Sequence, residues 1–241
     1  MVVLVTGSSK GVGRSTAVLF AKNGYDVVIN YKNDLRGAIK TKEKVEKYGV
    51  KSLVIKCDIS DEQQVINMID KINAEFGKLD CLVNNAGISK DSLPFDKTMD
   101  DFKEVLNVNL VGTYLVCKHA IKIMNKGSII NVSSNNALNA YYPMGLDYDA
   151  SKAGVNSLTH NLALALAPNI RVNAVAPGWV NTDMNKNMDS ELKKEEEDKI
   201  LLKRFAEPEE IAKVIYFVAS SEASYINNSV IRVDGGLNGS C

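Results

Sequence analysis

The sequence predicts an α/β fold, with a single doubly wound parallel sheet of seven strands, helices on both faces and a small helical lid. Short apolar runs alternate with longer segments of helical periodicity, which is typical of parallel strands joined by right-handed crossovers. The apolar runs are nearly unbroken, as expected for strands covered on both faces. The expected strands are 2–5, 27–29, 53–55, 81–83, 129–132, 172–175 and 230–233. The expected helices are about 13–22, 34–48, 61–76, 98–124, 149–167 and 208–219.

Residues that begin and end helices support these boundaries. Asp61, followed three residues later by Gln64, is typical of a helix start, and Gly77 is typical of the end of the same helix. Pro208 suits the first turn of the last helix, where Glu209 lies beside the positive end of the helix dipole. These signals predict helix boundaries near 61, 77 and 208.

The composition is that of an ordinary globular protein. The 241 residues are 45% hydrophobic and 24% charged, and no repeat or linker divides them, so we expect one domain over 1–241. The 29 basic and 29 acidic residues balance. No net field therefore favours nucleic acid or an anionic membrane as a partner.

The cysteines and the N-terminus predict a cytoplasmic location. The four cysteines are scattered, which argues against a disulfide framework and a zinc site and favours a reducing compartment. The first strand follows Met1 at once, which leaves no room for a signal peptide, and no apolar run approaches the ~20 residues of a membrane span. We expect a soluble cytoplasmic protein without a metal centre. The cysteines are Cys57, Cys81, Cys117 and Cys241.

A glycine-rich turn directly follows the first expected strand and opens the first helix. It has the sequence Thr-Gly-Ser-Ser-Lys-Gly-Val-Gly over 6–13. Gly7 would allow the sharp turn, Gly11 the close approach of a pyrophosphate, and Gly13 the packing of the helix on the sheet. Free N–H groups at the helix start would then face the anion. The alternative is a generic glycine-rich turn without a ligand.

The end of the second expected strand bears on the choice of dinucleotide. It has the sequence Asn30-Tyr31-Lys32, with no acid before Asp34. A carboxylate at this strand end would bind the ribose hydroxyls and repel a 2′-phosphate. Its absence, with Lys10 and Lys32 nearby, predicts NADPH/NADP+ over NADH. Lys10 would equally suit a solvated loop.

A tyrosine and a lysine form the candidate acid-base pair. Tyr148 and Lys152 are four residues apart, which on a helix places them on one face. A neighbouring ammonium stabilises a phenolate, so we expect Lys152 to lower the pKa of Tyr148 and make it a general acid or base. The two histidines, His119 and His160, lie in helical patterns and are not needed. The alternative is that the pair only decorates the surface.

Two further polar side chains are expected near this pair. Ser134 follows the fifth strand, at the edge where an open parallel sheet binds ligands, although serines there are also ordinary turn residues. Asn109 falls on the core-facing stripe of the expected helix 98–124, where a buried amide needs partners. It would either hold an ordered water with Lys152 or bond a neighbouring carbonyl.

These residues belong to a pattern that spans the chain. The sequence resembles the short-chain dehydrogenase/reductases, whose fold is of the Rossmann type. Each matching motif is modest, but their order and spacing together are specific. The motifs are TGSSKGVG at 6–13, Asp58, NNAG at 84–87, Asn109, Ser134, YDASK at 148–152, NAVAPG at 173–178 and VDGG at 233–236.

The resemblance implies an oxidoreductase that transfers hydride between a nicotinamide and a carbonyl carbon. Tyr148 would protonate the substrate oxygen, and Lys152 would lower its pKa and hold the nicotinamide ribose. Ser134 would bind the carbonyl, and Asn109 would support a proton relay through water. The implied cofactor-binding residues are Gly7, Ser9, Lys10, Gly11, Val12, Gly13, Asn30, Tyr31, Lys32, Asp58, Ile59, Asn85, Ala86, Gly87, Tyr148, Lys152, Pro177, Gly178, Val180 and Thr182.

Within that family the sequence is most similar to the 3-oxoacyl-acyl-carrier-protein reductases of fatty acid biosynthesis. The implied substrate is a 3-oxoacyl thioester. Basic residues for the acidic carrier usually stand where this chain has 124–127 and 165–168, and Lys126 is the only cation within these two ranges. The alternatives are a reductase or dehydrogenase for another small ketone, alcohol or sugar, and a dinucleotide-binding sensor without catalysis.

Two segments bear on substrate access and assembly. The charged stretch 191–198 predicts either a solvated surface helix or part of a mobile lid spanning about 181–206. The helix after Tyr148 is apolar around most of its circumference, which favours burial against a second subunit. Because the family that the chain resembles is commonly tetrameric, we expect a homotetramer, with a dimer as the alternative.

Overall fold

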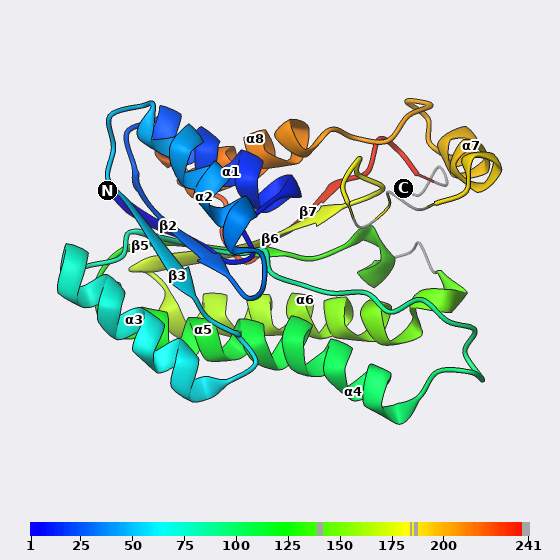
Figure 1. The fold of residues 1–241 in the computed structure, drawn as a ribbon, viewed down its shortest axis with the longest axis horizontal. Helices are drawn as coiled ribbons and strands as arrows, with labels where there is room; N and C mark the ends of the chain where they lie inside the picture. The colour runs from blue at the N-terminus through cyan, green and yellow to red at the C-terminus, as the bar shows by residue number, and fades with distance from the viewer. Residues whose placement is uncertain (139–141, 184, 186–187, 238–241) are drawn as a thin grey trace.

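The computed structural model contains a single seven-stranded parallel sheet, as the sequence predicts (Figure 1). It describes residues 1–138, 142–183, 185 and 188–237; parts of the expected lid, as well as Cys241, lie outside the described residues. The strand order is β3-β2-β1-β4-β5-β6-β7. The strands are β1 (Val2–Val5), β2 (Asp26–Tyr31), β3 (Ser52–Lys56), β4 (Cys81–Asn84), β5 (Gly127–Val132), β6 (Ile170–Pro177) and β7 (Val230–Val233).

Helices cover both faces of the sheet. Figure 1 shows α1, α2 and α8 on one face and α3, α4, α5 and α6 on the other. Alternate residues of β1 point to the two faces, so that Val3 packs in one apolar cluster and Leu4 in the other. The helices are α1 (Gly11–Lys22), α2 (Leu35–Glu46), α3 (Glu62–Phe76), α4 (Met99–Leu106), α5 (Thr113–Ala120), α6 (Leu146–Leu166), α7 (Ser190–Lys199) and α8 (Pro208–Ala219).

The predicted helix boundaries at 61, 77 and 208 are confirmed. Asp61 caps α3 because its carboxylate accepts a hydrogen bond from the backbone N–H of Gln64 at 3.1 Å. Gly77 ends the same helix in the left-handed conformation, with φ of +69°. Pro208 is the first residue of α8, and the preceding Glu207 forms a capping box with Glu210.

The expected helical segment 98–124 is confirmed in its extent, since residues 99–123 are helical throughout, but its middle is not a regular α-helix. Between α4 and α5, residues Asn107–Gly112 form a π-helical turn, which carries Asn109. The hydroxyl of Thr113 donates to the Asn109 carbonyl at 2.7 Å. A side chain at Gly112 would lie 2.9 Å from Ile59, so only a glycine fits there without displacing that neighbour. Apolar periodicity does not register such a local widening of a helix.

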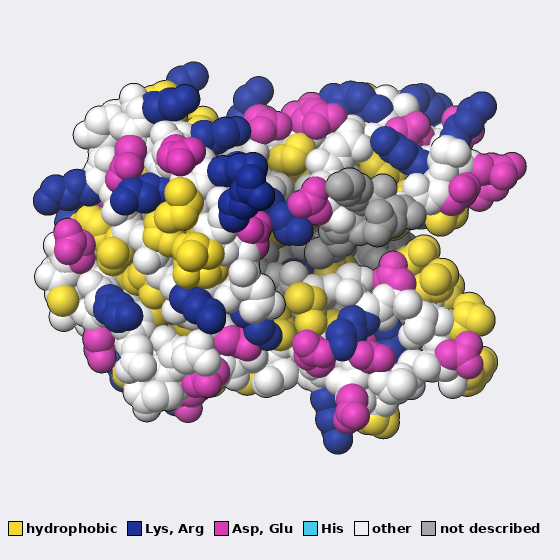
Figure 2. Space-filling view, in the orientation of Figure 1, with side chains coloured by type: hydrophobic (Ala, Val, Ile, Leu, Met, Phe, Trp, Pro, Cys, Tyr) yellow, Lys and Arg dark blue, Asp and Glu magenta, His cyan; other side chains and the backbone are white. Residues whose placement is uncertain are grey.

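The surface agrees with the even charge balance. The face drawn in Figure 2 mixes basic and acidic side chains, with a hollow beside α7. All residues of α7 are at least partly exposed, although its Glu196 accepts a hydrogen bond from the indole of Trp179 at 3.0 Å. Among the described residues, no helix combines the length and the hydrophobicity that crossing a bilayer requires.

Candidate active site

A cleft of about 540 Å³ lies at the carboxyl ends of the strands. After β1 the chain adds β2 and β3 on one side of that strand, and then crosses back to add β4 on its other side. The order in which strands are added to the sheet therefore changes direction at β1. Such a switch point is where open parallel sheets bind ligands. Every residue that the sequence predicts as cofactor-binding lines this cleft, as does Ser134, whereas Asn109 lies behind it.

The glycine turn is shaped by close backbone approaches. Gly7 has φ of +62°, and a Cβ there would lie 2.8 Å from the Cα of Ala86. A Cβ at Gly13 would lie 2.5 Å from the Asn85 side-chain amide. Lys10, which precedes α1, provides no side-chain cap for it. The first N–H groups of the helix therefore face the cleft, an arrangement that fits a pyrophosphate.

The 84–87 segment holds this turn in place. The Thr6 hydroxyl accepts hydrogen bonds from the backbone N–H groups of Asn85 and Ala86, both at 3.0 Å. The Asn85 side chain in turn donates to the carbonyls of Thr6 at 2.9 Å and Gly7 at 3.1 Å. The Asn85 side chain therefore braces the glycine loop, and Thr6 is a supporting residue that the sequence analysis left out of the site.

The end of the cleft beside β2 and β3 combines a cation with carboxylates. Lys32 forms an ion pair with Asp58 at 2.7 Å. Burial acts to raise the pKa of Asp58, but hydrogen bonds from Lys32 and Ser60 outweigh it and lower that pKa below its usual value. Asp34 also lines the cleft, while its carboxylate caps α2 through the Gly37 N–H at 2.7 Å. Asp34 is not among the site residues that the sequence predicts, although an acidic residue just before a helix is a recognisable capping signal.

Tyr148 and Lys152 face each other on the first turns of α6. The helix begins at Leu146, three residues earlier than predicted, so both residues are helical. The Lys152 ammonium lies 5.5 Å from the centroid of the Tyr148 ring and donates to the Val132 carbonyl at 2.7 Å. Lys152 is only 4% exposed, which excludes the alternative that the pair lies on the surface without a role in the site.

Burial dominates the acid-base properties of this pair. It raises the pKa of Tyr148 to about 12, although a hydrogen bond with Ser134 acts in the opposite direction. It lowers the pKa of Lys152 to about 8. The expected lowering of the tyrosine pKa is therefore wrong here. Removing the phenolate from water costs more free energy than its hydrogen bond with Ser134 provides. Tyr148 is held as a protonated phenol, which is the form of an acid.

Asn109 and Ser134 are brought to the same place from different elements. The Asn109 amide donates to the Ile88 carbonyl at 2.9 Å and to the Ser151 hydroxyl at 3.0 Å, and its oxygen accepts from the Ile88 N–H at 2.8 Å. The expected alternative, a bond to a neighbouring carbonyl, is thus confirmed. A Cβ at Gly87 would lie 3.2 Å from the Asn109 oxygen and 3.6 Å from the Lys152 nitrogen, so these groups flank one glycine.

Aromatic residues stand beside the cleft at its α7 end. Trp179 stacks on Phe205 with ring centroids 5.5 Å apart and contacts Tyr142 edge-to-face at 5.9 Å. The described parts of the segments 137–146 and 181–206 both contribute to this cluster, through Tyr142 and Phe205. Trp179, the only tryptophan of the chain, directly follows the Pro-Gly pair and was not singled out from the sequence.

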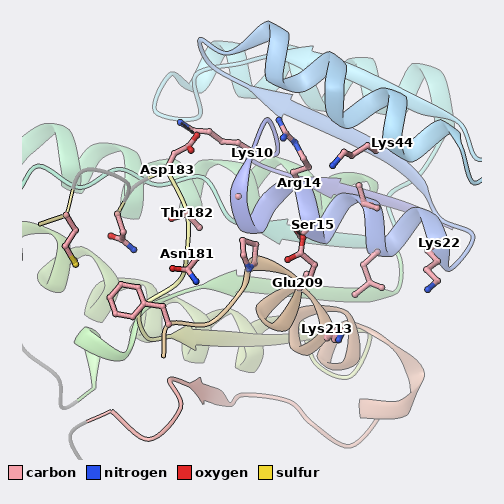
Figure 3. Close-up of a pocket in the computed structure, with 18 of the residues that line it drawn as sticks. Lys10, Arg14, Ser15, Lys22, Lys44, Asn181, Thr182, Asp183, Glu209 and Lys213 are labelled. Atoms are coloured by element: carbon pink, nitrogen blue, oxygen red, sulfur yellow. Dashed lines mark hydrogen bonds and ion pairs between the residues drawn. The ribbon is translucent and has the colours of Figure 1, made fainter. Parts of the chain in front are cut away.

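A second cavity, of about 630 Å³, adjoins the cleft between α1 and α8. Figure 3 shows Lys22, Lys44 and Lys213 around it and Lys10 beside Asp183, with which it forms an ion pair at 3.1 Å. It shares some residues with the first cleft but none of the four predicted catalytic residues lines it. The smaller cleft, which Ser134, Tyr148 and Lys152 line, is therefore the candidate active site.

The sheet, its uncapped helix start and the buried tyrosine–lysine pair define an oxidoreductase that uses a nicotinamide dinucleotide. The family described as enoyl-(acyl carrier protein) reductase matches residues 7–238. The chain belongs to the short-chain dehydrogenase/reductase family.

Similar proteins differ in their named activities. The 3-oxoacyl-(acyl-carrier-protein) reductase FabG of Aquifex aeolicus is 39% identical, over 98% of this chain and 96% of its own length. Glucose 1-dehydrogenase 2 of Bacillus subtilis is 36% identical, over 97% and 93%. The crystal structure of a short chain dehydrogenase from Burkholderia cenocepacia in complex with NADP superposes with a TM-score of 0.92, at 31% identity, covering 97% of this chain and 96% of that one.

The buried ammonium of Lys152 makes stability depend on pH. Because its pKa is lower in the folded than in the unfolded chain, the unfolded chain binds the proton more tightly between pH 8 and 10.5. Raising the pH through this range should therefore stabilise the wild-type protein relative to a Lys152→Met variant, by about 2 kcal/mol between pH 7 and 10. Parallel urea denaturation of both proteins measures this; an unchanged difference would contradict burial of the charged form.

Proposed function

We propose that the protein is an NADPH-dependent reductase of a carbonyl substrate, with Tyr148 as the general acid and a 3-oxoacyl thioester as the substrate class. The observation that carries the proposal is the protonated, buried phenol of Tyr148, held beside Ser134 and Lys152 in the dinucleotide cleft. The bound dinucleotide supplies the hydride. The relative crystallised with NADP supports the cofactor, and the 39%-identical FabG reductases support the substrate class.

The side chains divide the work of the reaction. Tyr148 gives its proton to the substrate oxygen as negative charge develops there, and the Ser134 hydroxyl donates a hydrogen bond to the same oxygen. The Lys152 ammonium stabilises the phenolate left behind and holds the nicotinamide ribose. Asn109 fixes the Ile88 backbone against α6, and in this proposal it also supports proton supply through water.

The remaining residues bind the dinucleotide along the cleft. The glycine turn holds the pyrophosphate, Asp58 and Ile59 face the adenine, and the 85–87 segment covers the adenosine side. The segment after β6 contacts the carboxamide, and the proposal treats 181–206 as a lid of one domain spanning 1–241. Val180 and Thr182 bind the carboxamide, while Pro177 and Gly178 are further cofactor-binding residues, and all four line the cleft.

A second candidate function is oxidation or reduction of a small polyol, sugar or ketone. The 36%-identical glucose dehydrogenase favours it, as does the scarcity of cations for an acidic carrier near 124–127 and 165–168. An NADPH-oxidation screen across a 3-oxoacyl thioester, a β-keto ester, quinones, sugars and simple ketones separates the two. A cytoplasmic location is part of the proposal, supported by three buried free cysteines.

Replacing Tyr148 by Phe tests the proposed acid. The variant keeps the ring but removes the proton, so kcat should fall about 10²–10⁴-fold while NADPH binding, measured by fluorescence titration, stays unchanged. Tyr142→Phe is the matched control, because Tyr142 lies near the cleft but away from Lys152, and should retain most activity. Turnover by Tyr148→Phe comparable to wild type would contradict the role.

The cofactor preference depends on cations at the adenosine end. Lys32 and Lys10, about half exposed and each paired with a carboxylate, can exchange those partners for a 2′-phosphate. We expect kcat/KM to be higher with NADPH than with NADH, and Lys32→Ala to reduce that ratio about tenfold or more. Lys51→Ala controls for loss of a surface charge elsewhere. A wild-type preference for NADH would refute this part of the proposal.

We also propose a homotetramer, because apolar side chains of α5 and α6 remain exposed in the single chain. Leu164 of α6 is 74% exposed, and Tyr114 of α5 is 46% exposed. Light scattering should give the mass of four chains, and Leu164→Glu should shift it towards smaller species. A monomeric wild-type protein would overturn this expectation.

A further inference from the structure

A buried ion pair lies directly beside the proposed acid. The Lys97 ammonium is 3.0 Å from one carboxylate oxygen of Asp147, the residue before Tyr148. The two side chains are 3% and 0% exposed, unlike the other lysine–carboxylate pairs in the described part of the chain, which all keep at least one partner substantially exposed. Neither residue has a role in the hydride transfer described above.

The pair joins two segments that border the active site. Lys97 ends the segment between β4 and α4, and its ammonium also donates to the Lys90 carbonyl, so it draws the two ends of the 90–97 loop together. Asp147 lies in the first turn of α6, and the oxygen that meets Lys97 also accepts the Tyr148 N–H at 2.9 Å. The same loop bonds the 142–146 segment through Ser92 N–H and the Met144 carbonyl at 3.2 Å.

Stability alone does not explain this pair. Withdrawing an ammonium and a carboxylate from water costs about as much as their attraction returns, so an apolar pair of similar size would serve stability as well. The second oxygen of Asp147 has no hydrogen-bond partner among the described residues, which adds to the cost. What an ion pair offers that an apolar contact lacks is a fixed distance and direction.

We propose that Lys97 and Asp147 are positioning residues that fix the first turn of α6, and with it Tyr148, against the 90–97 loop. The pair acts through the backbone, because Asp147 holds Lys97 and the Tyr148 N–H on one oxygen. Tyr148 is then anchored from three sides, by Asp147 at its backbone, Ser134 at its hydroxyl and Lys152 at its ring. The kinetic consequence rests on the proposed function, since it needs Tyr148 to be the acid.

Three variants separate positioning from stability. Lys97→Met leaves the Asp147 carboxylate buried without its partner, and Asp147→Asn does the same to the Lys97 ammonium. The double variant removes both charges, so neither is left unpaired. The melting temperature should therefore fall in the single variants and recover in the double variant. If the pair positions Tyr148, all three break the same interaction, so kcat should fall about tenfold or more in each, with KM for NADPH unchanged.

Lys90→Met is the matched control. Lys90 lies on the same loop and pairs with Asp101 and Glu104, but those contacts are exposed and do not reach α6. Its kcat should match wild type. If kcat of the double variant instead recovers along with its melting temperature, or if no variant loses activity, the positioning role is overturned.

A crystal structure of the double variant separates this proposal from the proposed function. A displaced Tyr148 ring and 90–97 loop support the positioning role whether or not the protein reduces a carbonyl, and an unmoved ring overturns it. If wild-type protein oxidises NADPH with none of the carbonyl substrates in the screen, the proposed function fails by itself.

Discussion

The structure depends on one constraint, that all seven strands run parallel. Each crossover must return the chain to the end of the sheet at which the strands begin. Every strand therefore finishes at the opposite end, where the carboxyl ends of all strands lie together. The glycine turn after β1, the 84–87 segment after β4, Ser134 after β5 and the 177–182 segment after β6 meet there for that reason. Helices on both faces complete the burial that parallel strands require, which leaves this edge as the place open to a ligand.

Desolvation is the second influence on the site. The same burial raises the pKa of Tyr148 and lowers the pKa of Lys152. Burial therefore favours the neutral form of both residues. Asn109 and Thr6 contribute differently, because their hydrogen bonds satisfy buried backbone groups and hold the reactive residues at fixed distances.

Three lysines in and around the cleft form ion pairs with nearby carboxylates. Lys10 and Lys32 reach the cleft but already have carboxylate partners, and the side chain of Lys97 is almost completely buried. The overall balance of 29 basic and 29 acidic residues reflects many such pairs, spread over a surface without a dominant sign on the face drawn in Figure 2. In the proposed function, the helix start and these two paired lysines, Lys10 and Lys32, are the groups that recognise the anionic parts of the cofactor.

The sequence by itself determined the order of strands and helices along the chain, the helix starts at Asp61 and Pro208, and a set of expected cofactor-binding residues that all line the cleft. These follow from hydrophobic periodicity, capping chemistry and motif spacing, all of which are local. Only the tertiary structure decided the rest. The π turn at Asn109, the raised pKa of Tyr148 and the Lys97–Asp147 pair arise from contacts between segments distant along the chain. Burial and three-dimensional proximity set these properties, and a linear pattern of residue types records neither.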